Sequence, residues 1–167
     1  MTNKDWETYE SKIEKRINSL LKNNFYFEII FLFGNILEAE LKHLIDEHQK
    51  ACRYILDREK IKFYPKNIFN SDKKTLGELK EYTASFIKDR SILEEMRNFN
   101  KLRIKTIHKL FNQNLENLEQ EIKKFIPSFH GLMEKLIDIR ISIIVSTQKY
   151  KTRELIHKYK KSHETTR

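Results

Sequence analysis

Arg103 and His108, separated by four residues, are the two side chains of this chain whose types and spacing best suit chemistry. Both fall on a stretch with helical apolar spacing, and Arg103 lies near the middle of the apolar arc. The arc is formed by Leu93, Met96, Phe99, Ile107, Leu110 and Phe111. A guanidinium is almost never fully buried alone, so Arg103 either meets an acid from another helix or opens onto an anion. Histidine is the side chain that most often serves as a general acid or base, so His108 is of the type that suits proton transfer.

Three further polar residues fall where they can support or neutralise this pair. Asn100 lies in the same arc and is expected to offer a hydrogen bond. Glu40 falls inside the apolar stripe of an earlier helix, and Glu38 borders that stripe. Either acid could pair with Arg103 inside a bundle, and Arg103 would then be a structural residue of a plain helical scaffold.

A single helix cannot bring Arg103 and His108 together. Five residues separate them by about 7.5 Å along the axis and about 140° around it. A two-fold dimer that joins this helix to its twin would place two Arg and two His in one cleft. The spacing therefore predicts a homodimer if the pair acts in catalysis.

The remaining pattern predicts an all-α chain with few, long elements. Only 3 Gly and 2 Pro occur in 167 residues. Two capping boxes are predicted, Thr75 with Glu78 and Ser91 with Glu94. Pro127 is expected to kink a helix or to start a new one at Ser128. The predicted helices cover residues 4–22, 24–62, 75 onward, 91–111, 115–125 and 128 to beyond 145, with a loop at 64–73 and a break at 112–114. Within the second helix, a continuous helix and a break near Cys52 are both open.

Charge and cysteine usage narrow the class of protein. The net charge is +9, which suits nucleic acid or another anionic surface, although amino-acid usage alone could also produce it. The single cysteine, Cys52, fits a reducing, cytoplasmic setting. No Cys or His set has zinc-ligand spacing, so no metal and no cofactor are expected. The longest apolar run, residues 25–33, is too short to span a bilayer.

The last twenty residues form a basic segment. Residues 148–167 hold seven Lys or Arg against two Glu, which supplies +5 of the net charge. Two interpretations are open, a solvated helix end or a phosphate-binding arm. The expected RNA-contacting cations are Lys105, Lys109, Lys149, Lys151 and Arg153.

Arg103, four residues and His108, with Asn100 before them, resemble the Arg-x4-6-His motif of the HEPN family, the higher eukaryotes and prokaryotes nucleotide-binding domains. The segment Leu37 to Lys42 is similar to the family's second helix, and the segment that begins at Thr75 is similar to the start of its third. The resemblance covers about residues 5–145. It implies an up-and-down bundle of five or six helices, which we assign to residues 1–147. The charge pattern adds a basic C-terminal helix or tail over residues 148–167.

The resemblance also implies a metal-independent endoribonuclease that acts on single-stranded RNA, in a toxin–antitoxin or antiviral defence setting. Arg103 and His108 would be its catalytic residues, supported by Asn100, Glu38 and Glu40. An RNA substrate, a second copy of the chain and an antitoxin protein are the implied partners. The residue after the motif arginine is Ile104, where active members usually carry a polar side chain. A catalytically silent module that binds RNA or a protein is therefore the alternative.

Overall fold

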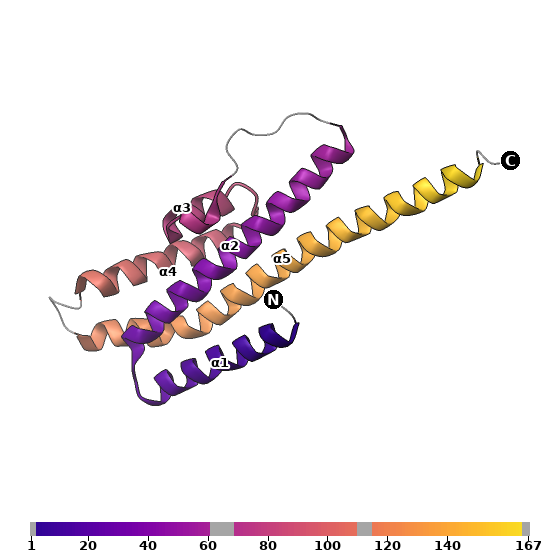
Figure 1. Ribbon diagram of the computed structural model, residues 1–167. Helices are drawn as coiled ribbons and strands as arrows, with labels where there is room; N and C mark the ends of the chain where they lie inside the picture. The colour runs from indigo at the N-terminus through magenta and orange to yellow at the C-terminus, as the bar shows by residue number, and fades with distance from the viewer. Residues whose placement is uncertain (1–2, 61–68, 110–114, 165–167) are drawn as a thin grey trace. The chain divides into compact units, whose positions relative to one another are not determined.

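The computed structural model describes residues 3–60, 69–109 and 115–164, and these residues are almost entirely helical. They form five α-helices and one short 3-10 helix, with no strand among them (Figure 1). The elements are α1 (Asn3–Lys22), α2 (Tyr26–Arg58), η1 (Ser71–Lys73), α3 (Leu76–Thr83), α4 (Arg90–Lys109) and α5 (Leu115–Glu164). The all-α class expected from the sequence is confirmed.

The chain divides into two compact units that share its two longest helices. The first unit comprises residues 1–38 and 89–132, and the second comprises residues 39–88 and 133–167. The N-terminal parts of α2 and α5 belong to the first unit, and their C-terminal parts belong to the second.

The first unit has an aromatic centre. Phe33 of α2 stacks on Phe129 of α5 with ring centroids 3.9 Å apart, and Phe99 of α4 lies 5.3 Å from Phe129. The other fully buried apolar residues of this unit come from the same three helices. They include Ile29, Ile30, Leu37, Met96, Ile122 and Leu132.

This aromatic centre explains why Pro127 does not end a helix. Pro127 lacks the N–H that would bond to the carbonyl of Lys123. Phe125 and Phe129, on either side of the proline, both contact Phe99, so packing holds both turns in line. Pro127 is itself exposed, and water can solvate the free carbonyl. Of the two predicted outcomes, a new helix that starts at Ser128 is wrong, because α5 is continuous across Pro127. A kink at Pro127 stays a prediction.

The second unit is built around the C-terminal half of α2. Leu41, Leu44 and Ile45 are buried, as are Leu79 of α3 and Leu136 of α5. The predicted capping box of α3 is confirmed, because the Thr75 hydroxyl and the Glu78 carboxylate both bond across the cap. The predicted break near Cys52 is wrong, since α2 continues to Arg58.

Two residues with positive φ follow the ends of α1 and α2. Asn24, with φ of 58°, follows α1, and the amide of Phe25 bonds back to the carbonyl of Leu20 at 2.9 Å. Lys60, with φ of 53°, follows α2 in the same way. Such residues close a helix by satisfying its last carbonyls. The end of α2 therefore precedes the predicted end at residue 62.

Candidate functional site

Helix α4 carries the predicted catalytic pair, and Asp89 fixes where it begins. The carboxylate of Asp89 accepts a hydrogen bond from the amide of Ser91 at 2.8 Å, as an N-cap side chain does. The predicted capping box between Ser91 and Glu94 is wrong, because the helix starts one residue earlier, at Arg90. Asp89 is a stronger cap, since its charge also suits the positive end of the helix dipole.

The buried stripe of α4 is rotated from the predicted arc. It consists of Ile92, Met96, Phe99, Leu102 and Thr106. Ile107 was expected in the core, but 41% of its surface is exposed. Arg103 therefore lies toward one edge of the stripe, about 20° from buried Met96 and about 40° from exposed Ile107, rather than at its centre.

Arg103 packs on a glycine and has no acid beside it. Its side chain covers Gly34 of α2, and a Cβ added there would lie 3.3 Å from Arg103 Cδ. Arg103 is half-buried, and its Nε atom is buried without a hydrogen-bond partner. Within the described residues, the guanidinium forms neither a hydrogen bond nor an ion pair. Both the arginine and the glycine belong to the first unit.

The two acids expected near Arg103 are used elsewhere. Glu40 is 4% exposed and accepts a hydrogen bond of 2.7 Å from Nε of Arg140, in the second unit. Burial raises the pKa of the Glu40 carboxyl, and the Arg140 hydrogen bond opposes that effect. Glu38 is half-buried and already engaged in an interaction of its own.

Asn100 shares the environment of Arg103. The two residues are three positions apart, so they lie on one face of α4. The Oδ1 atom of Asn100 is also buried without a hydrogen-bond partner. A buried acceptor and a buried donor are therefore both without a partner on this face of α4, which is uncommon in folded proteins.

Within one chain, His108 lies on a different side of α4 from Arg103. It is exposed near the end of α4, and helix geometry places it about 140° around the axis from Arg103. Ile104 and Ile107 occupy the arc between the two, with 43% and 41% of their surfaces exposed. Arg103 and His108 therefore flank an exposed apolar strip.

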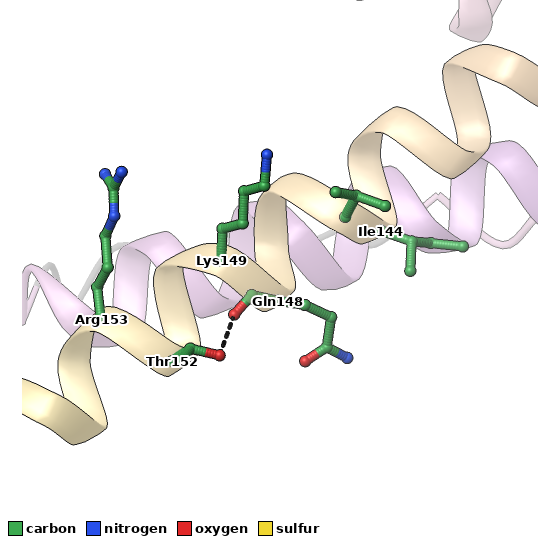
Figure 2. A pocket seen from close by; sticks show the side chains of 6 residues that line it. Ile144, Gln148, Lys149, Thr152 and Arg153 are labelled. Atoms are coloured by element: carbon green, nitrogen blue, oxygen red, sulfur yellow. Dashed lines mark hydrogen bonds between the residues drawn. The ribbon is translucent and has the colours of Figure 1, made fainter.

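The expected RNA-contacting cations divide into engaged and exposed side chains. Lys105 forms an ion pair with Glu121 of α5. Lys151 lies over the Tyr54 ring, 5.4 Å from its centroid. Lys149 and Arg153 are exposed on α5 (Figure 2). The side chain of Lys109 lies outside the described residues.

Sequence reasoning missed two residues that shape these sites. Gly34 gives Arg103 room, and the only signal for it was a glycine inside an otherwise strongly helical run. Arg140 neutralises Glu40, yet it is one of many cations and lies 100 residues away along the chain. Neither pairing could be found from helical spacing alone.

Two specialised features are absent from the ranges that the structure describes. No group of three or more His, Cys, Asp or Glu side chains is arranged to hold a metal ion there. No described helix combines the length and hydrophobicity that crossing a membrane requires. Neither a protein-family model, nor a curated protein, nor a solved structure matches this chain.

Proposed function

We propose that this chain is a metal-independent endoribonuclease of the HEPN type that cleaves single-stranded RNA. The observation that carries the proposal is the state of Arg103, a half-buried guanidinium with no acidic partner among the described residues. An anion most readily compensates a permanent positive charge in that position. The planar guanidinium can also donate two parallel hydrogen bonds to two phosphate oxygens. A structural ion pair with Glu40 has less support, because Glu40 bonds to Arg140.

The chemistry needs only proton transfer and charge stabilisation. The RNA 2′-OH attacks the adjacent phosphorus, the bond to the 5′ oxygen breaks, and a cyclic phosphate end forms. One histidine accepts the 2′-OH proton and another donates a proton to the leaving 5′ oxygen. Arg103 stabilises the charge that builds up on the phosphate oxygens. Asn100 is the positioning residue, because its carbonyl is the neighbouring acceptor that could hold Nε of Arg103.

A second copy of the chain completes the site in this proposal. One copy places Arg103 and His108 too far apart to act on one phosphate. Ile104 and Ile107 lie between them, and their exposed surfaces favour coverage by another protein surface. Two α4 helices that meet across this strip would bring Arg103 of one protomer toward His108 of its partner. A toxin–antitoxin or antiviral defence setting follows from the family resemblance only.

Ile104 favours the alternative function, a catalytically silent module of the same type that binds RNA or a protein. Its exposed aliphatic side chain follows Arg103 directly and offers no hydrogen bond to a substrate. The two proposals share the phosphate contact at Arg103 and differ only in whether His108 transfers protons.

The test is incubation of the purified chain with single-stranded RNA in EDTA. Cleavage with a cyclic phosphate end is expected, and Arg103→Ala and His108→Ala should each abolish it. Matched controls are Arg97→Ala, an exposed arginine of α4, and His130→Ala, an exposed histidine of α5. If the wild type binds RNA without cleaving it, and Arg103→Ala weakens that binding while His108→Ala does not, the silent module is correct. Cleavage by His108→Ala at the wild-type rate would refute the catalytic role.

A further inference from the structure

The C-terminal half of α5 has one face that is held by α2. Arg140 bonds to Glu40 at 2.7 Å, and the hydroxyl of Tyr54 donates to Glu154 at 2.5 Å. Arg58 also lies over the Tyr150 ring, 5.8 Å from its centroid. These contacts all belong to the second unit and follow one side of the α5 helix.

The opposite face of the same helix carries apolar side chains that stay exposed among the residues that the structure describes. Ile141, Val145 and Leu155 are 49%, 44% and 67% exposed. Together with Gln148 and Thr152, these residues follow one another at alternating spacings of four and three residues. This is the spacing of the residues that form the seam between the helices of a coiled coil. We call these five residues the seam. They extend for about 21 Å along the axis, at 1.5 Å per residue.

Basic side chains flank the seam on one side. A shallow groove of about 530 Å³ follows this face and is lined by Ile144, Val145, Gln148, Lys149, Thr152 and Arg153. Figure 2 shows Lys149 and Arg153 extending to the same side of the helix, one turn apart, while Gln148 points away from them. The Thr152 hydroxyl donates to the carbonyl of Gln148 at 3.1 Å, so this hydroxyl is not an unsatisfied donor in the seam.

We propose that this face of α5 docks an acidic amphipathic helix from another protein. The apolar seam fits the apolar stripe of such a helix, and the Lys149 and Arg153 edge fits carboxylates that flank that stripe. Gln148 and Thr152 are neutral polar seam residues, which set the register of a pair at some loss of affinity. The inference does not depend on ribonuclease activity, since it uses no residue of α4.

Charge complementarity selects this occupant over two others. A second copy of α5 would bring the same Lys149 and Arg153 edge against a chain whose net charge is +9. Single-stranded RNA would satisfy the cations, but phosphates and ribose cannot bury Ile141, Val145 and Leu155 as an apolar stripe does. Only an acidic amphipathic helix matches both features of the groove.

The test uses two designed three-heptad peptides with the same apolar seam and either Glu or Lys at the flanking positions. We expect the full chain to bind the Glu peptide about tenfold more tightly than the Lys peptide at low salt. Val145→Glu should abolish binding of the Glu peptide. Ser146→Glu, an exposed neighbour off the seam with the same charge change, should retain binding. Fluorescence anisotropy measures each affinity, and thermal melting checks that each variant is folded.

A charge reversal provides the independent variant. Lys149→Glu with Arg153→Glu should reverse the preference between the two peptides while leaving the seam intact. Equal affinity of the wild type for both peptides overturns the proposal, as does unchanged binding by Val145→Glu. A dimer of the full chain that Val145→Glu dissociates, but Ser146→Glu does not, would assign the face to a second copy. Displacement of the bound Glu peptide by single-stranded RNA, with loss of RNA binding in Lys149→Glu/Arg153→Glu, would assign it to RNA.

Discussion

The side chain of Arg103 lies directly over Gly34, so that a Cβ at position 34 would come within 3.3 Å of Arg103 Cδ. A glycine inside a helix destabilises it by about 1 kcal/mol relative to alanine. Here the missing side chain lets a charged residue of α4 lie close to the α2 backbone. Gly34 is therefore the structural reason that Arg103 can be half-buried at this point of the first unit.

Gly34→Ala should separate stability from function. In this variant the Arg103 side chain must move by a few tenths of an ångström. The strain of this movement offsets part of the stabilisation, up to about 1 kcal/mol, that alanine gives a helix relative to glycine. We expect a small change in the free energy of unfolding, together with weaker RNA binding or cleavage, because the guanidinium moves. Denaturant unfolding and the RNA assay measure the two effects.

Gly131→Ala is the matched control. Gly131 also lies inside a helix of the first unit, and a Cβ there would meet nothing within 4 Å. It should raise the free energy of unfolding by about 0.5–1 kcal/mol and leave RNA activity unchanged. If both variants behave alike, the contact between Gly34 and Arg103 has no functional role.

Arg140→Met should be one of the most destabilising single changes in the second unit. It leaves the Glu40 carboxylate buried without its partner, and breaking such a pair costs about 3–5 kcal/mol. The lower end is expected, because the Arg140 side chain is 20% exposed. The double variant Glu40→Leu/Arg140→Met removes both charges and should recover much of the loss. A double variant less stable than Arg140→Met alone would contradict this account.

The pH dependence of stability should reveal Glu40. Burial raises the pKa of Glu40 above its ordinary value of 4.5, so the folded chain holds this proton more tightly than the unfolded chain. Its contribution to stability is full below pH 4.5 and is lost as the pH rises through the raised pKa. As the pH rises from 4.5 through the raised pKa, the free energy of unfolding of the wild type should therefore fall relative to that of Glu40→Gln. A constant difference between the two proteins would show that the pKa is not raised.

Glu78 should show the opposite pH dependence. Its hydrogen bond from Lys74, followed by those from the amide and hydroxyl of Thr75, lowers its pKa to about 2. The carboxylate therefore stabilises the fold above pH 4.5, and this contribution is lost as the pH falls toward 2. Glu78→Gln should be less stable than the wild type at pH 7, and the difference should shrink in acid. The effect should be modest and sensitive to salt, because 44% of the side chain is exposed. Glu81→Gln, an exposed acid of the same helix, is the control.

Local chemistry made the α3 cap predictable, whereas tertiary contacts decided the features that were mispredicted. The Thr75 and Glu78 capping box depends on neighbours in sequence, and it was found. Ser91 and Glu94 have the same spacing, but Asp89 caps α4 instead, because its carboxylate accepts a hydrogen bond from the amide of Ser91. A new helix at Ser128 was mispredicted because aromatic rings from α2 and α4 hold α5 in line on both sides of Pro127.

The candidate site was predictable in its residue types but not in its pairings. The sequence placed Arg103 and His108 on one helix, and the structure has both on α4. Ile107 was assigned to the core because hydrophobicity alone cannot tell which edge of an apolar arc is covered. Which acid neutralises which arginine also depends on contacts between residues about 100 positions apart, such as Glu40 and Arg140.

Arg103→Met should provide the sharpest test of why an unpaired arginine lies at the edge of the core. Met keeps an unbranched apolar stem over Gly34 and removes the buried Nε that lacks a partner. An unsatisfied buried polar group costs about 1–3 kcal/mol, so the variant should be as stable as the wild type or more stable. If Arg103 binds phosphate, the same change should abolish RNA cleavage and greatly weaken RNA binding. Added RNA oligonucleotide should raise the melting temperature of the wild type but not of the variant, because a ligand stabilises only the state that binds it. A marked loss of stability in Arg103→Met, with RNA binding retained, would instead make Arg103 a structural residue and would remove the main support for the proposed function.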